Sequence, residues 1–292
     1  MKRSTLLTKD IGWAEGPRWH DGLLYFSDMY GDRTVQTVDA NGERRVVVEV
    51  PTHPSGLGWT ADGDLLIVSM DDNAIVRLPR GGGDLVLHSS LVDLAVAVND
   101  MFVLRDGTAF VGDNGFRFGE EAPRPGRIIR VGPDGSAAVV ADGLALPNGL
   151  AATSDESALV VAETLGGRLT RFVIGEDRSL SGCELQFAGD ELARSADIAD
   201  LLDLEVFFTR PFAPDGICVD ARDRVWIGNP FRDVIQCIDQ SGEVVDEVQL
   251  SLGATATAVG GEDGRTLFVA TGVPTETFTG RTSRIESCVL TD

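Results

Sequence analysis

The chain repeats one short pattern six times, and this repetition restricts the possible folds more than any other feature. Each copy has a short apolar run, a polar turn and a second apolar run, as in EGPRWHDGLLYFSD from Glu15. Two such runs around a tight polar turn are typical of a β-hairpin. The copies begin, in chain order, at Glu15, Ser55, Asn99, Asn148, Asp215 and Thr257.

A repeat of about 40–50 residues with three or four strands is the signature of a β-propeller. A third short apolar run follows the hairpin in several copies, as in AIVRL, RIIRV and RLTRF. Six copies therefore predict an all-β fold, a six-bladed β-propeller that forms a single domain over residues 1–292. A small sheet cannot bury both of its faces alone, whereas blades stacked in a ring cover one another.

The two ends of the chain together span about one further repeat. We therefore expect N-terminal and C-terminal strands to combine in one blade and close the ring. The step from Asn148 to Asp215 is too long for one blade. Its surplus has Leu192, Ile198 and Leu201 at helix-like spacing, which predicts a short helical insertion between blades around 189–205.

Composition restricts the possible partners. The chain has 46 Asp and Glu against 25 Lys and Arg, a net charge of −21, which disfavours nucleic acid and anionic membranes. No apolar run is long enough for a signal peptide or a membrane span. The four cysteines lack CxxC spacing, which favours reduced thiols. We expect a cytoplasmic protein, monomer or homodimer, that acts on a small molecule.

The first residues of the six repeats are expected to meet at one mouth, because the innermost strand of each propeller blade lines the central channel. All six carry side-chain oxygen atoms. Two carboxylates and two amides in a partly dry channel would repel each other or go unsatisfied without a positive partner. The candidate metal ligands are Glu15, Asn99, Asn148 and Asp215, with Ser55 and Thr257 as channel hydroxyls.

A hard divalent cation fits a ligand set made only of oxygen atoms. Ca²⁺ is the first choice, and Mg²⁺, Mn²⁺, Zn²⁺ and Fe²⁺ stay open because such sites accept each of them according to supply. The ring has neither His nor Cys, which argues against a dedicated zinc site. A single Asn-Gly or Asp-Gly usually marks only a turn, so the shared register of the copies carries this prediction.

Several stretches match one known family in its order, from about residue 12 to 272: AEGPRW, PSGLGW, VNDMFV, LPNGL, PDGICVDARDRVWIG and VGGEDGRTLFV. In them the chain resembles the SMP-30/gluconolactonase/luciferin-regenerating-enzyme family, six-bladed propellers that include metal-dependent lactonases. The resemblance implies metal ligands at Glu15, Asn148 and Asp215, and a further ligand or substrate contact at Asn99. Members that act on sugar lactones often have an arginine two residues before this asparagine. Here the position is Ala97, which removes a polar contact to a sugar.

The opening of a lactone, a cyclic ester, requires a polarised carbonyl group and a base for the attacking water. Asp215 is the predicted catalytic base, and Glu15 is the second choice. Asn99 and Ser55 are predicted to contact the substrate. His53 is a further candidate contact, because it precedes Ser55 by two residues, and Phe116 is expected to wall an apolar pocket from a long loop.

Two other functions fit the same residues. A metal ion that polarises a carbonyl oxygen also polarises a phosphoryl oxygen, so a phosphotriesterase is an alternative. A binding or regulatory propeller that uses the ion only to stabilise its channel is the other, since a fold does not determine a function. The sequence favours the metal-dependent lactonase.

Overall fold

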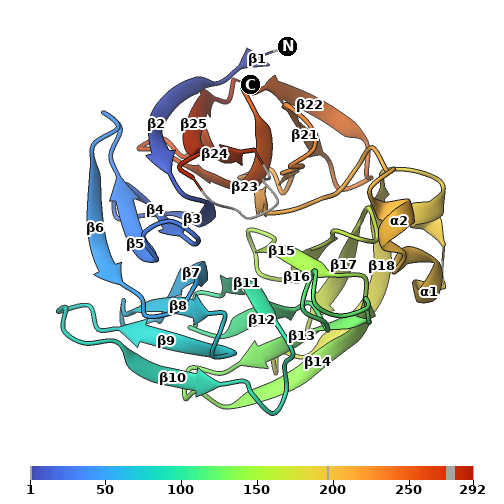
Figure 1. Cartoon of the computed structure of the whole chain (residues 1–292), viewed down its shortest axis with the longest axis horizontal. Helices are drawn as coiled ribbons and strands as arrows, with labels where there is room; N and C mark the ends of the chain where they lie inside the picture. The colour runs from blue at the N-terminus through green and yellow to red at the C-terminus, as the bar shows by residue number, and fades with distance from the viewer. Residues whose placement is uncertain (1, 196, 274–279, 292) are drawn as a thin grey trace.

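Six β-sheets form a closed ring in the computed structural model, which describes residues 2–195, 197–273 and 280–291 (Figure 1). The predicted six-bladed propeller is confirmed. The innermost strands contact one another in a circle, from β3 through β7, β11, β15, β19 and β23 back to β3. Residues 1, 196, 274–279 and 292 of the predicted domain lie outside the described residues.

Blades 1 to 3 each contain four antiparallel strands, ordered from the channel outwards as in the sequence. Blade 1 consists of β3 (Ala14–His20), β4 (Leu23–Asp28), β5 (Thr34–Val38) and β6 (Arg44–Glu49). Blade 2 consists of β7 (Pro54–Trp59), β8 (Leu65–Ser69), β9 (Ala74–Leu78) and β10 (Val86–Ser90). Blade 3 consists of β11 (Val98–Val103), β12 (Ala109–Asp113), β13 (Gly126–Val131) and β14 (Ala137–Leu144).

Blades 4 to 6 continue the pattern, and the first two strands of blade 5 have only three residues each. Blade 4 consists of β15 (Pro147–Ala152), β16 (Ala158–Glu163), β17 (Arg168–Ile174) and β18 (Leu180–Ala188). Blade 5 consists of β19 (Ile217–Val219), β20 (Val225–Ile227), β21 (Val234–Ile238) and β22 (Val244–Gln249). Blade 6 consists of β23 (Gly253–Gly260), β24 (Thr266–Gly272), β25 (Ser283–Val289) and the N-terminal β2 (Thr5–Ile11).

The ring is closed by hydrogen bonds between the two ends of the chain. Strand β2 pairs antiparallel with β25 and becomes the outer strand of blade 6, so the predicted closure is confirmed. Strand β1 (Lys2–Arg3) also pairs, in parallel, with β22 of blade 5, a contact that the sequence did not indicate. The N-terminal segment thus holds two neighbouring blades together (Figure 1).

Helical turns occupy the long connection before blade 5, as predicted. They comprise η1 (Leu192–Arg194), α1 (Ile198–Leu201) and α2 (Leu204–Phe207), and they lie at the margin of the ring beside β18 (Figure 1). Behind α2, the buried guanidinium of Arg210 forms two 2.8 Å hydrogen bonds with the carboxylate of Asp190. It also donates to the carbonyl oxygen of Leu165 at 2.7 Å, which ties the insertion to blade 4.

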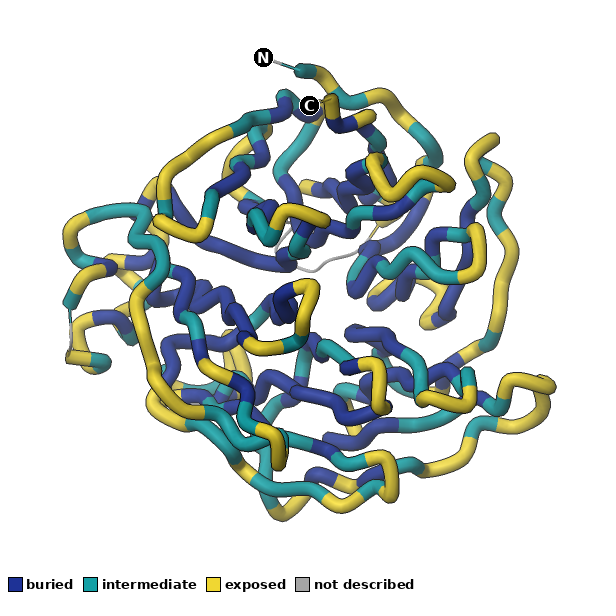
Figure 2. The backbone as a smooth tube through the Cα atoms, turned by 180° about the vertical axis from the view of Figure 1, so that it is seen from behind, coloured by how far each residue is buried: buried dark blue, intermediate teal, exposed yellow. Residues whose placement is uncertain are grey.

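Apolar clusters between neighbouring blades form the core. Leu24 and Phe26 of blade 1 are buried with Phe268 and Ile285 of blade 6, and similar clusters separate the other blades. The buried residues accordingly lie mainly in the inner strands of the blades, and the exposed residues lie in the turns and on the outer strands (Figure 2). Each large buried side chain stabilises the fold by about 1.5–3 kcal/mol. No helix of the described residues is long and apolar enough to cross a membrane.

Glu286 at the ring closure provides a test of how the ring is held. Its buried carboxylate accepts hydrogen bonds from the hydroxyl groups of Ser4, Ser251 and Thr271. We expect Glu286→Ala to lower the free energy of unfolding by roughly 2–4 kcal/mol, because it leaves buried donors unpaired and creates a cavity. Urea denaturation measures this, with Glu262→Ala on the exposed β23–β24 turn as the control. Equal midpoints for the two variants would contradict this role.

Candidate functional site

The longer connections of the propeller lie on one face of the ring. Because successive strands reverse direction, the segments that precede each inner strand share a face with the turns between the second and third strands. This face holds the connection 114–125 between β12 and β13 and the insertion between β18 and β19. The opposite face has tight turns such as 21–22. Long loops on a rigid scaffold are where binding residues gather, so we call this face the mouth.

A break in strand pairing marks the start of the repeats. In β11 the register shifts between Val98 and Met101, so Asn99 falls in a β-bulge. Strands β3, β7 and β15 have a register shift at the corresponding place. A bulge removes a residue from the regular ladder and re-aims its side chain. The repeated bulge therefore explains how these inner strands present polar groups to the channel, whereas β19 begins at Ile217, after Asp215, and has no register shift.

The sixth repeat begins two residues earlier than the sequence suggested. In β23 the shift lies between Ala254 and Ala256, so Thr255 occupies the bulge. Thr257 lies further along the strand, with its hydroxyl 3.5 Å from the carbonyl oxygen of Gly216. Strand side chains alternate with a period of two, so a slip by two residues preserves the apolar pattern and escapes detection in the sequence.

Glycine follows the polar residue in several repeats because neighbouring inner strands approach closely. A side-chain carbon at Gly149 would lie 2.4 Å from the carbonyl oxygen of Asp215. One at Gly216 would lie 2.5 Å from the methyl carbon of Ala256. Asn148-Gly149 and Asp215-Gly216 are therefore close contacts between blades rather than hairpin turns.

The polar side chains of four blades converge at the mouth. The Ser55 hydroxyl donates to Oδ1 of Asn99 at 2.9 Å, and Nδ2 of Asn99 donates to Oδ1 of Asn148 at 3.1 Å. The Asn148 side chain in turn forms a hydrogen bond with the carboxylate of Asp215. The structure thus brings together Ser55, Asn99, Asn148 and Asp215 in one chain of contacts.

Glu15 reaches the same group from blade 1. Its Oε1 accepts a 2.9 Å hydrogen bond from Nε1 of Trp13. Burial raises the pKa of Glu15 well above its ordinary value, the charges of Asp215 and Asp100 raise it further, and the Trp13 hydrogen bond lowers it. Burial also raises the pKa of Asp215 from 3.8 to about 8, with a further contribution from the charge of Asp100. Two acids are therefore held close together at an electrostatic cost.

This donor set suits a hard cation but not a soft one. The channel offers the carboxylates of Glu15 and Asp215 and the amide oxygens of Asn99 and Asn148, the ligand types that Ca²⁺ and Mg²⁺ prefer. Among the described residues, no group of three or more His, Cys, Asp or Glu side chains is arranged to hold a metal ion. Any ion here would therefore depend on the amides as well as the acids.

An arginine of blade 1 contacts an acid of blade 3 further along the inner strands. Nη2 of Arg18, from β3, lies 3.3 Å from Oδ1 of Asp100 on β11, and it also donates to the carbonyl oxygen of Met101. Burial raises the pKa of Asp100, and Arg18 offsets part of this rise. Asp100 occupies the position that glycine fills in most other repeats, so its side chain can enter the channel.

Buried acids at the ends of the second strands support the loops that lead into the site. Asp28 accepts a hydrogen bond from the backbone N–H of Trp13 at 3.1 Å. Asp113 accepts a hydrogen bond from the backbone N–H of Ala97 at 2.7 Å. Glu163 accepts one from the backbone N–H of Ala145, also at 2.7 Å. Our sequence reasoning missed this set, although the apolar runs LLYFSD, TAFVGD and ALVVAE each end in one of these acids.

Phe116 and His53 lie in different surroundings. Phe116 is fully buried against Leu201 and Phe207 of the helical insertion, so its predicted contact with a substrate would require the insertion to move. Phe118, whose ring centroid lies 6.2 Å away, is half exposed. His53 directly precedes β7 and lies on the mouth face.

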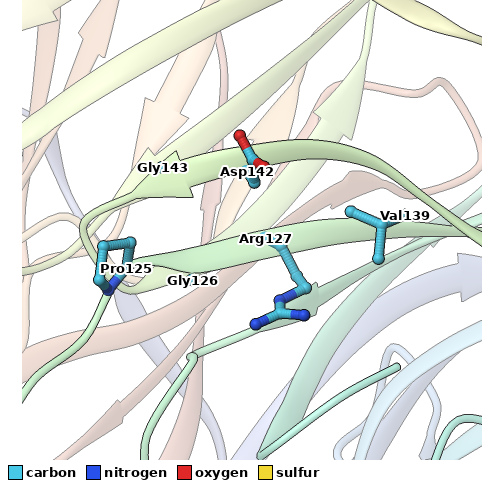
Figure 3. Close-up of a pocket in the computed structure, with 6 residues that line it drawn as sticks. All are labelled: Pro125, Gly126, Arg127, Val139, Asp142 and Gly143. Carbon is cyan, nitrogen blue, oxygen red and sulfur yellow. The ribbon is translucent and has the colours of Figure 1, made fainter. Parts of the chain in front are cut away.

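One surface pocket of the described residues has a lining that shares no residue with this group. It has a volume of about 380 Å³ and lies between the start of β13 and the end of β14, where Arg127 and Asp142 are among its lining residues (Figure 3). The Arg127 guanidinium already pairs with Asp113 at 3.2 Å and donates to the carbonyl oxygen of Leu94. Convergent polar groups, rather than pocket volume, therefore identify the candidate site.

The family follows from a sequence comparison. A model of the SMP-30/Gluconolactonase/LRE-like region matches residues 13–273. The chain belongs to this family. The match includes all the polar residues of the mouth described above, from Trp13 and Glu15 to Asp215 and Thr255.

Several characterised proteins are similar to this family member. A pentonolactonase of Haloferax volcanii is 24% identical over 261 residues, which cover 88% of this chain and 81% of the relative. A calcium-binding protein, regucalcin, of Agrobacterium tumefaciens superposes with a TM-score of 0.78 at 19% identity, over 99% of this chain and 94% of the other. A gluconolactonase of Xanthomonas campestris superposes with a TM-score of 0.74 at 23% identity, and the match covers 97% of this chain and 88% of the other.

The raised pKa of Asp215 predicts how stability depends on pH. In protein treated with a chelator, folded Asp215 keeps a proton up to about pH 8, whereas the unfolded chain releases it near its ordinary value. The folded state therefore binds more protons between these limits, and stability falls as the pH rises through this range. Thermal unfolding should show this fall, and Asp215→Asn should flatten it and raise the Tm at pH 8 by roughly 5 °C. If the Tm of the wild type and of Asp215→Asn fell equally with rising pH, the prediction would be contradicted.

Proposed function

We propose that this protein is a divalent-metal-dependent lactonase, with one cation held by Glu15, Asn99, Asn148 and Asp215. The observation that carries the proposal is the convergence of two acids with raised pKa values and two amides at the mouth of the channel. The charges that act on Glu15 come from Asp215 and Asp100, both negative, and Arg18 is engaged by Asp100. A bound cation would relieve this repulsion, and Ca²⁺ suits the oxygen donors first.

The proposed chemistry assigns separate tasks to the residues. A divalent cation in this position supplies Lewis acidity towards a carbonyl oxygen and makes nearby water more acidic. Asp215 takes the proton of the attacking water, since it is a buried carboxylate that is hydrogen-bonded to Asn148 and lies within electrostatic reach of Glu15. Asn99 and Ser55, which are hydrogen-bonded to each other, orient the lactone. Glu15 serves mainly as a ligand.

The similarity to a pentonolactonase and a gluconolactonase supports a lactone as the substrate class. Ala97 stands where sugar-lactone members often have arginine, so we propose that this enzyme depends less on substrate hydroxyl groups. The four free cysteines support a reducing, cytoplasmic location. The net charge of −21 supports small-molecule partners rather than nucleic acid or a membrane, and the assembly is proposed to be a monomer or homodimer.

Neutralising either acid should abolish turnover without unfolding the protein. We expect Asp215→Asn to lower kcat/KM for γ- and δ-lactones by at least about 100-fold, because a proton acceptor is lost, and Glu15→Gln to have a similar effect through weaker ion binding. A pH-stat assay measures both. Glu286→Gln neutralises a buried acid at the ring closure and is the matched control. Normal turnover in Asp215→Asn would contradict the assigned base.

Removal and return of metal ions separates the competing functions. We expect EDTA to abolish lactone hydrolysis, and Ca²⁺, Mn²⁺ or Mg²⁺ to restore it together with a higher Tm, since binding to the folded state stabilises it. Metal analysis of the purified protein identifies the resident ion. Hydrolysis of a paraoxon-like triester in place of any lactone would favour the phosphotriesterase. A metal-dependent rise in Tm with no turnover of either would favour a binding propeller.

A further inference from the structure

A histidine and an aspartate form a close pair on the mouth face beside the proposed metal centre. Nδ1 of His53 lies 2.8 and 2.9 Å from the two carboxylate oxygens of Asp71. An ionised carboxylate can only accept hydrogen bonds, so Nδ1 carries the proton and Nε2 is the atom left to act on another molecule. The His53 side chain is 26% exposed, which keeps it accessible.

An aromatic ring packs on this imidazole and connects it to the site. The Tyr30 ring centroid lies 5.1 Å from that of His53, at a tilt of 55°. Burial raises the pKa of Tyr30, and the charges of Glu15 and Asp71 raise it further. Tyr30 therefore lies within electrostatic reach of a proposed metal ligand on one side and of the His53–Asp71 pair on the other.

The positions of His53 and Asp71 along the chain also place the pair on the mouth face. His53 ends the segment that leads into β7, and Ser55, two residues later, is hydrogen-bonded to Asn99. Tyr30 and Asp71 belong to the turns between the second and third strands of blades 1 and 2, which open on the mouth face. His53 and Ser55 therefore reach the mouth on the same short segment of chain, at the start of β7.

We propose that His53, oriented by Asp71, is the general acid that protonates the leaving alkoxide; this inference rests on the proposed lactone hydrolysis. Water loses a proton to Asp215 and its oxygen bonds to the carbonyl carbon. The ring C–O bond then breaks, and the alkoxide oxygen takes a proton from Nε2 of protonated His53. Asp215 releases its proton to solvent and His53 regains one, so that lactone and water give one hydroxy acid.

The other two histidines occupy unsuitable places. His20 ends β3 on the opposite face, where its ring stacks on Trp59 at a centroid distance of 4.0 Å. His88 lies on the outer strand β10, and burial lowers its pKa. His53 is thus the histidine that the fold directs to the site.

Leaving groups of different basicity test this role. An aliphatic lactone such as δ-valerolactone expels an alkoxide about as basic as hydroxide, whereas dihydrocoumarin expels a phenolate of a phenol with pKa about 10. We expect His53→Gln to lower kcat for δ-valerolactone by about 100-fold and for dihydrocoumarin by less than about 3-fold. Asp71→Asn should show the same selectivity to a smaller degree, and His88→Gln is the control.

Imidazole ¹⁵N chemical shifts provide a measurement that does not need turnover. In the wild type, neutral His53 should carry its proton on Nδ1, and Asp71→Asn should return it to a mixture of tautomers. An equal loss on both lactones, no loss on either, or an unchanged tautomer in Asp71→Asn overturns the inference. Wild-type protein that opens neither lactone with any of the metals overturns the proposed function itself, which separates the two failures.

Discussion

The pairing of β2 with β25 is the interaction on which the rest of the structure depends. Blade 6 stands between blade 5, which carries Asp215, and blade 1, which carries Glu15. Without its outer strand this blade would expose an unpaired edge, and its neighbours would no longer be held at a fixed separation. Two acids that repel each other stay together only because the backbone around them is rigid. The buried Glu286, with its three hydroxyl donors, reinforces the closure from inside.

The candidate site also depends on small irregularities. Bulges release Asn99 and its counterparts from regular pairing, and Gly149 and Gly216 let adjacent inner strands approach closely enough for their polar neighbours to touch. Regular strands with larger residues would hold these side chains apart. The acids Asp28, Asp113 and Glu163 then hold the loops at the mouth through backbone N–H groups. Rigid support of this kind is what a precise binding site requires.

Much of the fold could be predicted because repetition and strand alternation are visible in the chain itself. The blade number, the ring closure and the helical insertion all followed from spacing, and so did the grouping of Glu15, Asn99, Asn148 and Asp215. Contacts between residues far apart in sequence could not be predicted in this way. The pairing of Arg18 with Asp100, the burial of Phe116 under the insertion and the parallel contact of β1 depend on side-chain and backbone positions that no local pattern encodes. The sequence pattern places the sixth repeat at Thr257 although it begins at Thr255, because an alternation with a period of two looks the same after a shift of two residues.

The Arg18–Asp100 pair affects how a small molecule can enter and leave the channel of the propeller. Its hydrogen bonds join blades 1 and 3 past blade 2, below the candidate site. A compound that entered from the loop-rich face would therefore meet this ion pair below the candidate site, where the two side chains narrow the hub. A molecule bound at the mouth would then enter and leave through the loop-rich face, so one occupant would have to depart before the next could bind.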